Sequence, residues 1–244
     1  MISPDHKILL CRDAKALAMK GAGLFINYAC QSIHKKGAFY VALSGGSTPK
    51  ALYCLLSGDN YKKKIDWKNV HFFWGDERTV CQDHAQSNYG MANEVLLKKL
   101  DLPQSNIHRI EGEKGEKAAH IYSLELTEII KHKNNDVPIF DLIILGMGSD
   151  GHTASLFPGT KTLFEMDKLV DYLYVEKLDS YRITITPPLI KTASNILILV
   201  SGKEKAHILK EVQEEKTLLN KYPVSIANEC EGNVVWLIDK AASE

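Results

Sequence analysis

The sequence predicts an α/β protein in which a mostly parallel sheet lies between two layers of helices. Short runs that are almost entirely apolar, such as residues 70–74 and 140–146, alternate along the chain with longer amphipathic segments. Strands without polar alternation are typical of a parallel sheet that is covered on both faces. Because 244 residues with 45% hydrophobic side chains can bury a substantial core, we expect a single three-layer α/β/α domain over residues 1–244.

The expected elements follow one another with clear signals. Residues 14–36 carry apolar side chains at three- and four-residue spacing, as an amphipathic helix does, so the chain opens as strand, helix, strand. Strands are expected at residues 7–11, 38–43, 70–74, 140–146, 195–200 and 233–239. Further helices are expected from residue 49, over about 87–100, around 117–131 and within 203–213. The polar stretches 111–119 and 131–138 are expected to be loops, the former alternatively a helix start, and the part from Leu209 onward to complete the sheet.

The charge balance gives no global attraction to nucleic acid or to an anionic membrane. Thirty basic and thirty acidic residues leave a formal net charge of zero. The N-terminal stretch lacks a long apolar segment, so we expect no signal peptide, and no run of about 18 apolar residues indicates a membrane span. Five scattered cysteines without a C-x-x-C pair suit reduced thiols. We therefore expect a cytoplasmic protein with no nucleic-acid or membrane partner, which binds any anion locally.

A glycine-rich loop follows the strand at 38–43. In open parallel sheets, ligands bind at the carboxyl ends of the strands. Here Gly45, Gly46, Ser47 and Thr48 stand before Pro49 and offer backbone N–H groups and hydroxyls at a helix start, which predicts an anion site. The alternative is an ordinary tight turn with Thr48 as N-cap and Pro49 as the first helical residue. The spacing is neither G-x-G-x-x-G nor a Walker loop, which argues against a nucleotide.

An acid and a histidine follow the strand at 140–146. Gly146 and Gly148 would let the backbone turn sharply, which brings Asp150 and His152 out at the end of the sheet. A single histidine is usually structural. Because a carboxylate two residues away can orient it or tune its charge, we favour a general base.

Charged residues follow or flank three further strands. They are Asp76, Glu77, Arg78, Arg182, Lys203 and Lys205. The first three stand together directly after the strand at 70–74 and need partners, unless they lie in a solvated turn. The basic residues near the other strands could clamp a phosphate, although lysines on helices are most often hydrated surface groups.

Metal and serine-nucleophile chemistry lack their usual sequence signals. The nine histidines include no H-E-x-x-H and no tight His/Cys cluster, so we expect no metal site. There is also no G-x-S-x-G, the usual sign of serine-dependent acyl transfer. The remaining candidate sites suggest that water attacks a phosphorylated small molecule.

Six stretches of the sequence together resemble the 6-phosphogluconolactonase family. They are LSGGSTPKALY, GDER, HAQSNYGMANEVLL, LGMGSDGHTASLFPG, RITITPPLI and SGKEKA, which span roughly Val41 to Ala206. The string GMGSDGHTASLFPG is highly specific, whereas SGGSTP and GKEKA are shared with the related glucosamine-6-phosphate deaminases. The resemblance implies a Rossmann-like three-layer fold, which both groups share.

The resemblance also implies an activity and catalytic residues. The reaction would be hydrolysis of 6-phospho-D-glucono-1,5-lactone to 6-phosphogluconate, in the oxidative pentose phosphate pathway, without a metal or organic cofactor. By this likeness His152 activates water, and Asp150 holds the histidine or shapes the pocket. Arg78 would stabilise the developing oxyanion or hold the sugar ring, and Asp76 would line the site.

The same resemblance implies a phosphate site and leaves two alternative functions open. The phosphate would lie against the amides of residues 45–48, with Arg182 and Lys205 neutralising its charge. The first alternative is a deaminase, but deaminases carry the pattern D-G-H-x-x-x-x-E-P-G, and Phe157 stands here in place of its glutamate. The second is a non-catalytic sugar-phosphate sensor. Such regulators place a helix-turn-helix ahead of the sensor, whereas the roughly 40 residues before the loop are occupied here by a strand and a helix.

Overall fold

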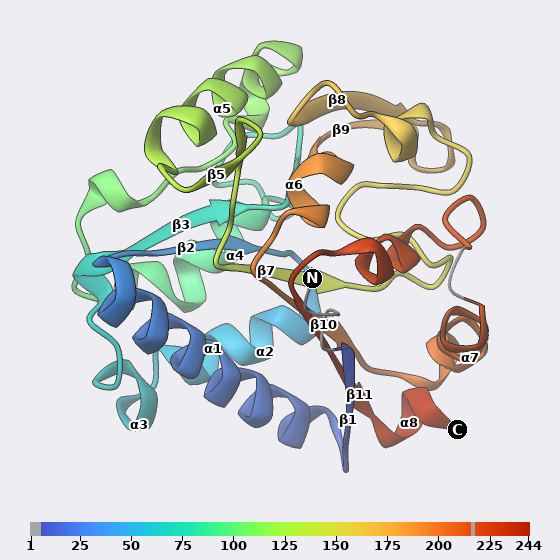
Figure 1. The fold of residues 1–244 in the computed structure, drawn as a ribbon, viewed down its shortest axis with the longest axis horizontal. Coiled ribbons are helices and arrows are strands. Elements are labelled where there is room, and N and C mark those ends of the chain that lie inside the picture. Colours follow the sequence, from blue (N-terminus) through green and yellow to red (C-terminus); the bar gives the residue numbers. More distant parts are fainter. Residues whose placement is uncertain (1–5, 216–217) are drawn as a thin grey trace.

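A six-stranded parallel sheet forms the centre of the molecule (Figure 1). The computed structural model describes residues 6–215 and 218–244. Residues 1–5, which begin the stretch where we expect no signal peptide, lie outside the described residues. The strands are β1 (His6–Cys11), β2 (Phe39–Leu43), β3 (Val70–Trp74), β7 (Leu142–Gly146), β10 (Asn195–Val200) and β11 (Asn233–Asp239). Their order is β1-β11-β10-β7-β2-β3, and all neighbours run parallel. The predicted α/β class and all six predicted strands are confirmed.

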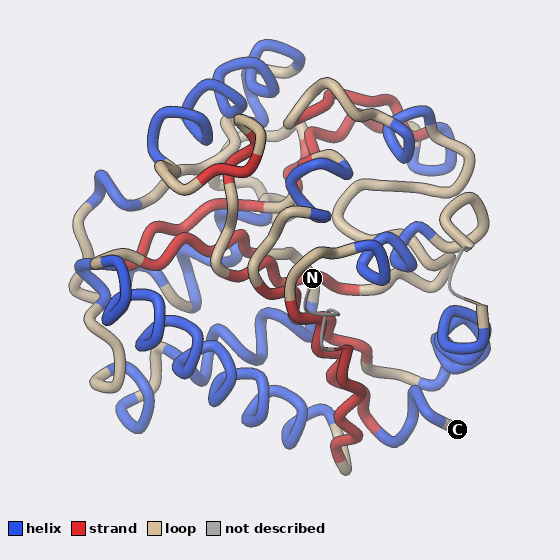
Figure 2. The backbone as a smooth tube through the Cα atoms, viewed as in Figure 1, coloured by secondary structure: helices blue, strands red, loops and turns tan. Residues whose placement is uncertain are grey.

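Helices cover both faces of this sheet (Figures 1 and 2). Helices α1 (Ala14–Lys36) and α2 (Ser47–Leu56) pack on one face and against each other, while α5 (Glu116–Ile129) and α6 (Pro187–Lys191) lie on the opposite side. The structure also contains α3 (Asp59–Lys62), α4 (Asn88–Val95), α7 (Ala206–Glu214) and α8 (Lys240–Ser243). Among the described helices none is both long and apolar enough to cross a membrane.

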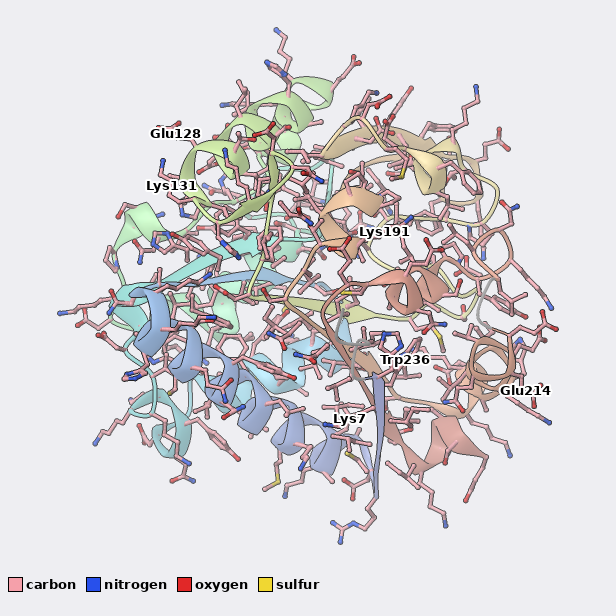
Figure 3. The ribbon with its side chains drawn as sticks, in the orientation of Figure 1. Lys7, Glu128, Lys131, Lys191, Glu214 and Trp236 are labelled. Atoms are coloured by element: carbon pink, nitrogen blue, oxygen red, sulfur yellow. The ribbon has the colours of Figure 1, made fainter. Side chains whose placement is uncertain are left out.

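Most charged side chains project into solvent, whereas most apolar side chains of the sheet are buried. Figure 3 shows Glu128 and Lys131 projecting outward at the end of α5, whereas Trp236 of β11 lies inside, 5% exposed. The central strand β7 is buried on both faces, because Leu142, Ile143, Ile144 and Leu145 are fully inaccessible. This explains why the strand is apolar throughout instead of alternating.

Local signals account for helix α1. Asp13 caps its start by accepting a hydrogen bond from the backbone N–H of Ala16 at 2.7 Å, and Gly37, in the left-handed region with φ 77°, ends it. A Cβ on Gly21 would lie 2.5 Å from Leu52, so this glycine allows α1 and α2 to approach closely. The predicted helix over 14–36 is confirmed at both ends.

Three other predicted helices end or begin elsewhere. Helix α2 begins at Ser47 and not at residue 49. The helix predicted over about 87–100 ends at Val95, because Leu96 adopts φ −128° and ψ −68° and a 3-10 turn follows. The segment predicted from residue 203 opens with a 3-10 turn, and the α-helix starts only at Ala206.

A second sheet was not predicted. It is antiparallel and consists of β4 (Asp76–Arg78), β9 (Ser180–Ile185) and β8 (Val170–Val175) in the order β4-β9-β8. The stretch predicted as a loop at 131–138 contains a small hairpin, β5 (Lys133–Asn134) with β6 (Val137–Pro138), and its two turn residues have positive φ. Both elements are short or partly polar, so they lack the continuous apolar runs that mark the central strands.

The strand order creates a crevice between β2 and β7. From β2 the chain proceeds outward to β3, whereas from β7 it proceeds in the opposite direction to β10 and β11. The loops that leave the carboxyl ends of β2 and β7 therefore diverge, and such a switch point is where open α/β sheets bind ligands. Residues 44–48 and 147–152 occupy it.

Candidate active site

A cavity of about 190 Å³ opens at the switch point. Its lining includes residues 45–48 after β2, Asp76 and Arg78 on β4, His152 after β7, and Lys205 after β10. The structure thus brings together eight of the ten predicted site residues, which come from four separate stretches of sequence. Asp150, Arg182 and the alternative Lys203 do not line the cavity.

The loop at 44–48 is held by a buried tyrosine. The Tyr53 hydroxyl accepts a hydrogen bond from the Ser44 N–H at 2.9 Å and donates one to the Ser44 carbonyl at 3.0 Å. Complete burial raises the pKa of Tyr53, so the hydroxyl stays protonated and can donate. Gly46 has φ 99°, a conformation that other residues rarely adopt, and directly precedes α2.

This geometry differs from the ordinary turn that was the alternative for the loop. The residue before α2 is Gly46 and not Thr48, and no side chain caps the helix. Pro49 lies in the first turn, as expected, but is the third helical residue. The first N–H groups of a helix have no acceptor within the helix, so Ser47 and Thr48 present theirs at the cavity with the positive end of the helix dipole.

Asp76 connects the loops around the cavity. Its carboxylate is 6% exposed and accepts hydrogen bonds from Ser155 Oγ at 2.6 Å and Asn88 Nδ2 at 3.2 Å. A Cβ on Gly45 would lie 1.9 Å from Asn88 Oδ1, so that position admits only glycine while Asn88 stays in place. Sequence analysis missed Asn88 and Ser155 as site residues, although both lie within the motifs HAQSNYG and DGHTASLFPG.

Glu77 anchors the start of α4. Its carboxylate is 2% exposed and accepts hydrogen bonds from the backbone N–H groups of Arg78, Asn88 and Tyr89 and from Ser87 Oγ, at 2.7–3.1 Å. Burial raises the pKa of Glu77, and the backbone hydrogen bonds oppose that effect. This residue is therefore structural, and its neighbours on either side, not Glu77 itself, face the cavity.

Two arginines are cross-strand neighbours on the small sheet. Arg78 and Arg182 are direct partners in the β4–β9 register. The Arg78 Nη1 donates to the Gln86 carbonyl at 2.5 Å, but its buried Nε has no hydrogen-bond partner among the described residues. Burial and the neighbouring charge of Arg78 lower the pKa of Arg182. The positive charge of Arg78, which lines the cavity, and that of its neighbour Arg182 favour an anion in the cavity.

His152 forms a close pair with Asp150. Its Nδ1 lies 2.5 Å from Asp150 Oδ1, which also accepts the His152 backbone N–H at 3.2 Å. Lys177 donates to the second carboxylate oxygen at 2.8 Å. The hydrogen bond from His152 and that from Lys177 hold the pKa of Asp150 well below its usual range. Asp150 is therefore a carboxylate that holds Nδ1 of His152 and does not engage the other ring nitrogen, Nε2, of this cavity-lining side chain.

The glycines of this loop act differently from the expectation. Neither Gly146 nor Gly148 has positive φ, and the left-handed positions of the loop are Gly151, with φ 78°, and Ala154, with φ 47°. Gly148 is needed for space, because a Cβ there would lie 2.1 Å from His152 Nδ1. The turn does begin at Gly148, whose carbonyl accepts a hydrogen bond from the Gly151 N–H at 3.1 Å, whereas Gly146 is the last residue of β7.

Phe157 covers one side of the histidine. Its ring stacks on the imidazole with centroids 4.4 Å apart and planes 28° apart. Its other contacts form a small apolar cluster with Leu173 and Val175 of β8. An apolar ring thus lies against His152 at the position where the deaminase pattern has glutamate.

The C-terminal part supports this loop from behind. The Val224 N–H donates to the Gly151 carbonyl at 2.9 Å, and a Cβ on Gly151 would lie 3.1 Å from the Cα of Tyr222. The segment therefore completes the sheet through β11, as expected, and also buttresses the histidine loop, which was not expected.

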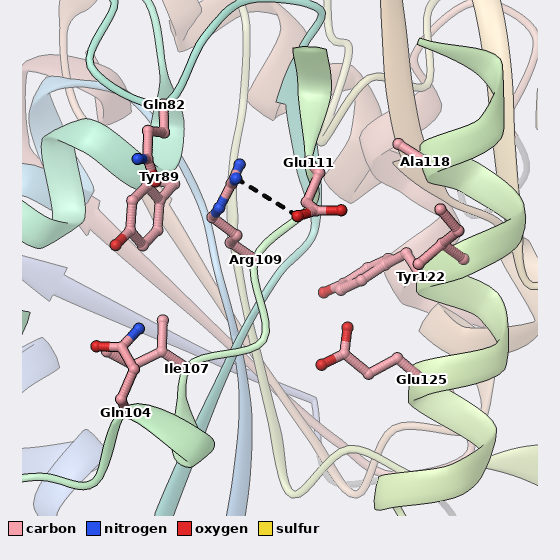
Figure 4. Close-up of a pocket in the computed structure, with 10 residues that line it drawn as sticks. Gln82, Tyr89, Gln104, Ile107, Arg109, Glu111, Ala118, Tyr122 and Glu125 are labelled. Carbon is pink, nitrogen blue, oxygen red and sulfur yellow. Dashed lines mark ion pairs between the residues drawn. The ribbon is translucent and has the colours of Figure 1, made fainter. Parts of the chain in front are cut away.

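A second pocket, of about 320 Å³, lies between α4 and α5 (Figure 4). Its arginine, Arg109, makes a bidentate ion pair with Glu113 at 2.6 and 3.0 Å, lies 3.6 Å from Glu111, and covers the ring of Tyr89. The guanidinium charge is thus already neutralised. Although this pocket is larger, the glycine loop and the acid–histidine pair lie at the switch-point cavity, so we assign the site there.

The fold and the site define an α/β protein with a glycine-rich loop and an acid–histidine pair at its switch point. The family model described as glucosamine-6-phosphate isomerases/6-phosphogluconolactonase matches residues 12–236. The chain belongs to this family, which confirms the resemblance seen in its motifs.

Known proteins resemble the chain over nearly its whole length. A 6-phosphogluconolactonase from Haemophilus influenzae is 41% identical over 207 residues, which cover 83% of this chain and 85% of that protein. One from Synechocystis sp. is 38% identical over 216 residues, covering 88% and 87%. The 6-phosphogluconolactonase structure from Trypanosoma brucei superposes with a TM-score of 0.89 at 29% identity, covering 99% and 98%. A monomeric glucosamine-6-phosphate deaminase, at 19% identity and TM-score 0.81, shares the fold.

Proposed function

We propose that this protein hydrolyses 6-phospho-D-glucono-1,5-lactone to 6-phospho-D-gluconate. The observation that carries the proposal is the carboxylate-bound His152, which lies in one cavity with the glycine loop at the start of α2. A base and an anion site in one cavity suit a substrate that reacts at one end and is held by phosphate at the other. Relatives named 6-phosphogluconolactonase at 38–41% identity support it.

His152 acts as the general base in this proposal. Because Nδ1 donates its hydrogen to Asp150, Nε2 carries the lone pair and takes a proton from water as the water oxygen attacks the lactone carbonyl. The tetrahedral oxyanion forms beside Arg78, whose positive charge stabilises it. The ring C–O bond then breaks, the proton passes from His152 to the departing ring oxygen, and the product carboxylic acid ionises.

The phosphate lies against the loop at 45–48 in this proposal. The N–H groups of Ser47 and Thr48 and the dipole of α2 bind it, and Lys205 lies across the same cavity. Arg182 supplies a further positive charge next to Arg78, at the edge of the cavity and not in its lining. The phosphate does not change during the reaction, so these contacts serve binding rather than the chemical step.

Phe157 favours the lactonase over the deaminase. An aromatic ring can neither accept a hydrogen bond from imidazole nor balance the charge of imidazolium as a carboxylate does. The lactone carbonyl is already open to attack, so one base and one oxyanion site suffice, whereas opening an amino-sugar ring needs the missing acid.

The deciding experiment compares two substrates on one preparation. We expect the purified protein to hydrolyse freshly generated 6-phosphogluconolactone, after correction for spontaneous hydrolysis, and to release no ammonia from glucosamine 6-phosphate. Ammonia release at a rate comparable to lactone turnover would contradict the proposal. Phosphate binding without either reaction would instead favour the sensor.

We further propose that residues 1–244 form one functional domain that works in the cytoplasm, without a cofactor and without nucleic-acid or membrane partners. All five cysteines are free thiols, which suits a reducing compartment. The proposed hydrolysis needs only water and protein side chains.

A further inference from the structure

A lysine outside the cavity reaches the acid of the acid–histidine pair. Lys177 lies on the turn between β8 and β9, and its Nζ is 2.8 Å from Asp150 Oδ2, while Asp150 Oδ1 lies 2.5 Å from His152 Nδ1. Lys177 thus engages one carboxylate oxygen of Asp150, and His152 engages the other. Sequence analysis did not single out Lys177.

The turn that carries Lys177 is well defined. It is a 3-10 turn over Glu176–Leu178 and closes at Asp179, whose φ is 45° and whose carboxylate accepts a hydrogen bond from the Tyr174 hydroxyl. Strand β9 pairs on its other edge with β4, which carries Arg78. The small sheet therefore places the positive charge of Lys177 beside Asp150, the partner of His152, and the positive charge of Arg78 in the lining of the cavity.

An ordinary role in stability does not explain this contact. The Lys177 side chain is 64% exposed, and exposed ion pairs contribute little to the free energy of unfolding. Its carboxylate partner is only 21% exposed and lies directly against the imidazole. The contact therefore acts more strongly on the orientation and charge balance of the pair than on the fold.

We propose that Lys177 is a positioning residue for hydrolysis, which keeps the Asp150 carboxylate aimed at His152 Nδ1 and offsets part of its negative charge. This inference rests on the proposed function, since it assumes that His152 is the base. Without the lysine, Asp150 is free to rotate away from Nδ1. Its full negative charge also favours the protonated, inactive form of His152, so the neutral base is lost at a higher pH.

The size of the charge effect follows from Coulomb's law. A unit charge on the order of 6 Å away, in surroundings close to water, shifts a titration by about 0.5 pH units. The other charged groups around the cavity near His152 are Asp76, Arg78 and Lys205, and Phe157 covers one face of the ring. All of them remain when Lys177 is replaced, so a change in the pH profile reports on the lysine alone.

The test compares Lys177→Met, Lys177→Arg and the control Lys168→Met. Lys168 is matched, because it is 62% exposed and pairs with Asp171 at 3.1 Å on the same small sheet, away from His152. For Lys177→Met we expect kcat on the pH plateau to fall about 2- to 5-fold, KM to stay unchanged, and the acid limb of the pH–rate profile to move up by about 0.5 pH units. Lys177→Arg should restore both, and Lys168→Met should match the wild type.

A Lys177→Met profile that coincides with that of Lys168→Met would overturn the inference. So would an arginine variant as impaired as the methionine variant. The acid limb is read as a ratio of rates within one variant, so it does not depend on the fraction of protein that folds. The wild type and His152→Gln, measured in parallel, separate the hypotheses. A wild type that does not hydrolyse the lactone contradicts the proposed function, and an active His152→Gln removes the histidine as the base. If His152→Gln is inactive and Lys177→Met is normal, only the role of Lys177 fails.

Discussion

Replacing Gly148 by alanine is expected to disable the active site without unfolding the protein. The backbone at Gly148 does not have positive φ, so alanine can adopt it. Its Cβ, however, would lie 2.1 Å from Nδ1 and 2.2 Å from Cε1 of His152, and 2.9 Å from Asp150 Oδ1. The conflict falls on the imidazole ring, a side chain that can move, and not on the main chain of another element.

The displacement sets the expected magnitude. Ordinary van der Waals contact begins at 3.4 Å, so the ring must move by about 1.3 Å, which takes Nδ1 away from its carboxylate and Nε2 away from the reacting water. A misplacement of about 1 Å in a catalytic group costs on the order of 100-fold in rate. We therefore expect kcat to fall about 100-fold, while the loop at 45–48, which supplies none of the three atoms nearest the new methyl group, keeps its affinity for inorganic phosphate.

The assay is the rate of 6-phosphogluconate formation, corrected for spontaneous hydrolysis, together with phosphate inhibition and thermal unfolding. Gly23→Ala on the exposed side of α1 is the control, because its Cβ meets nothing within 4 Å and alanine favours a helix by up to about 1 kcal/mol. It should raise the melting temperature slightly and leave kcat unchanged. Wild-type kcat in a folded Gly148→Ala enzyme would refute the assignment of His152 and its packing.

His152→Ala should lower kcat by about 100-fold or more with little change in substrate binding, since general-base catalysis contributes a factor of about 10² to 10⁴ to the rate. Single-turnover rates at saturating lactone measure the loss. Near-wild-type turnover would remove His152 from the mechanism. Arg182→Ala and Lys205→Ala should each raise KM more than they lower kcat, and inorganic phosphate should compete weakly; unchanged KM in both would place the phosphate elsewhere. The unfolding free energy should fall as pH drops from about 6.5 to 4. Burial and the adjacent His108 lower the pKa of His71 to about 4 in the folded protein. In this pH range only the unfolded chain therefore binds a proton at His71. After a discount for partial exposure the loss is about 1–2 kcal/mol, and denaturant titrations of His71→Gln should lack it; an equal loss in that variant would assign it to other groups.

Much of the local structure could be predicted from the sequence, because local structure depends on neighbouring residues. Unbroken apolar runs predicted the six central strands, and three- and four-residue spacing predicted α1. The glycine loop at 45–48 and the pair Asp150 and His152 could be identified for the same reason, since each lies within one short stretch after a strand.

Strand order and contacts between distant segments were decided only by the tertiary structure. Although β1 opens the chain, it pairs with β11 at the far edge of the sheet, and nothing local to residues 6–11 specifies that partner. The small antiparallel sheet places Arg182 beside Arg78 and brings Lys177 to Asp150, across 104 and 27 residues of chain. Apolar periodicity states which face of an element is buried, but the partner of that face depends on the packing of the whole core, which no single segment encodes.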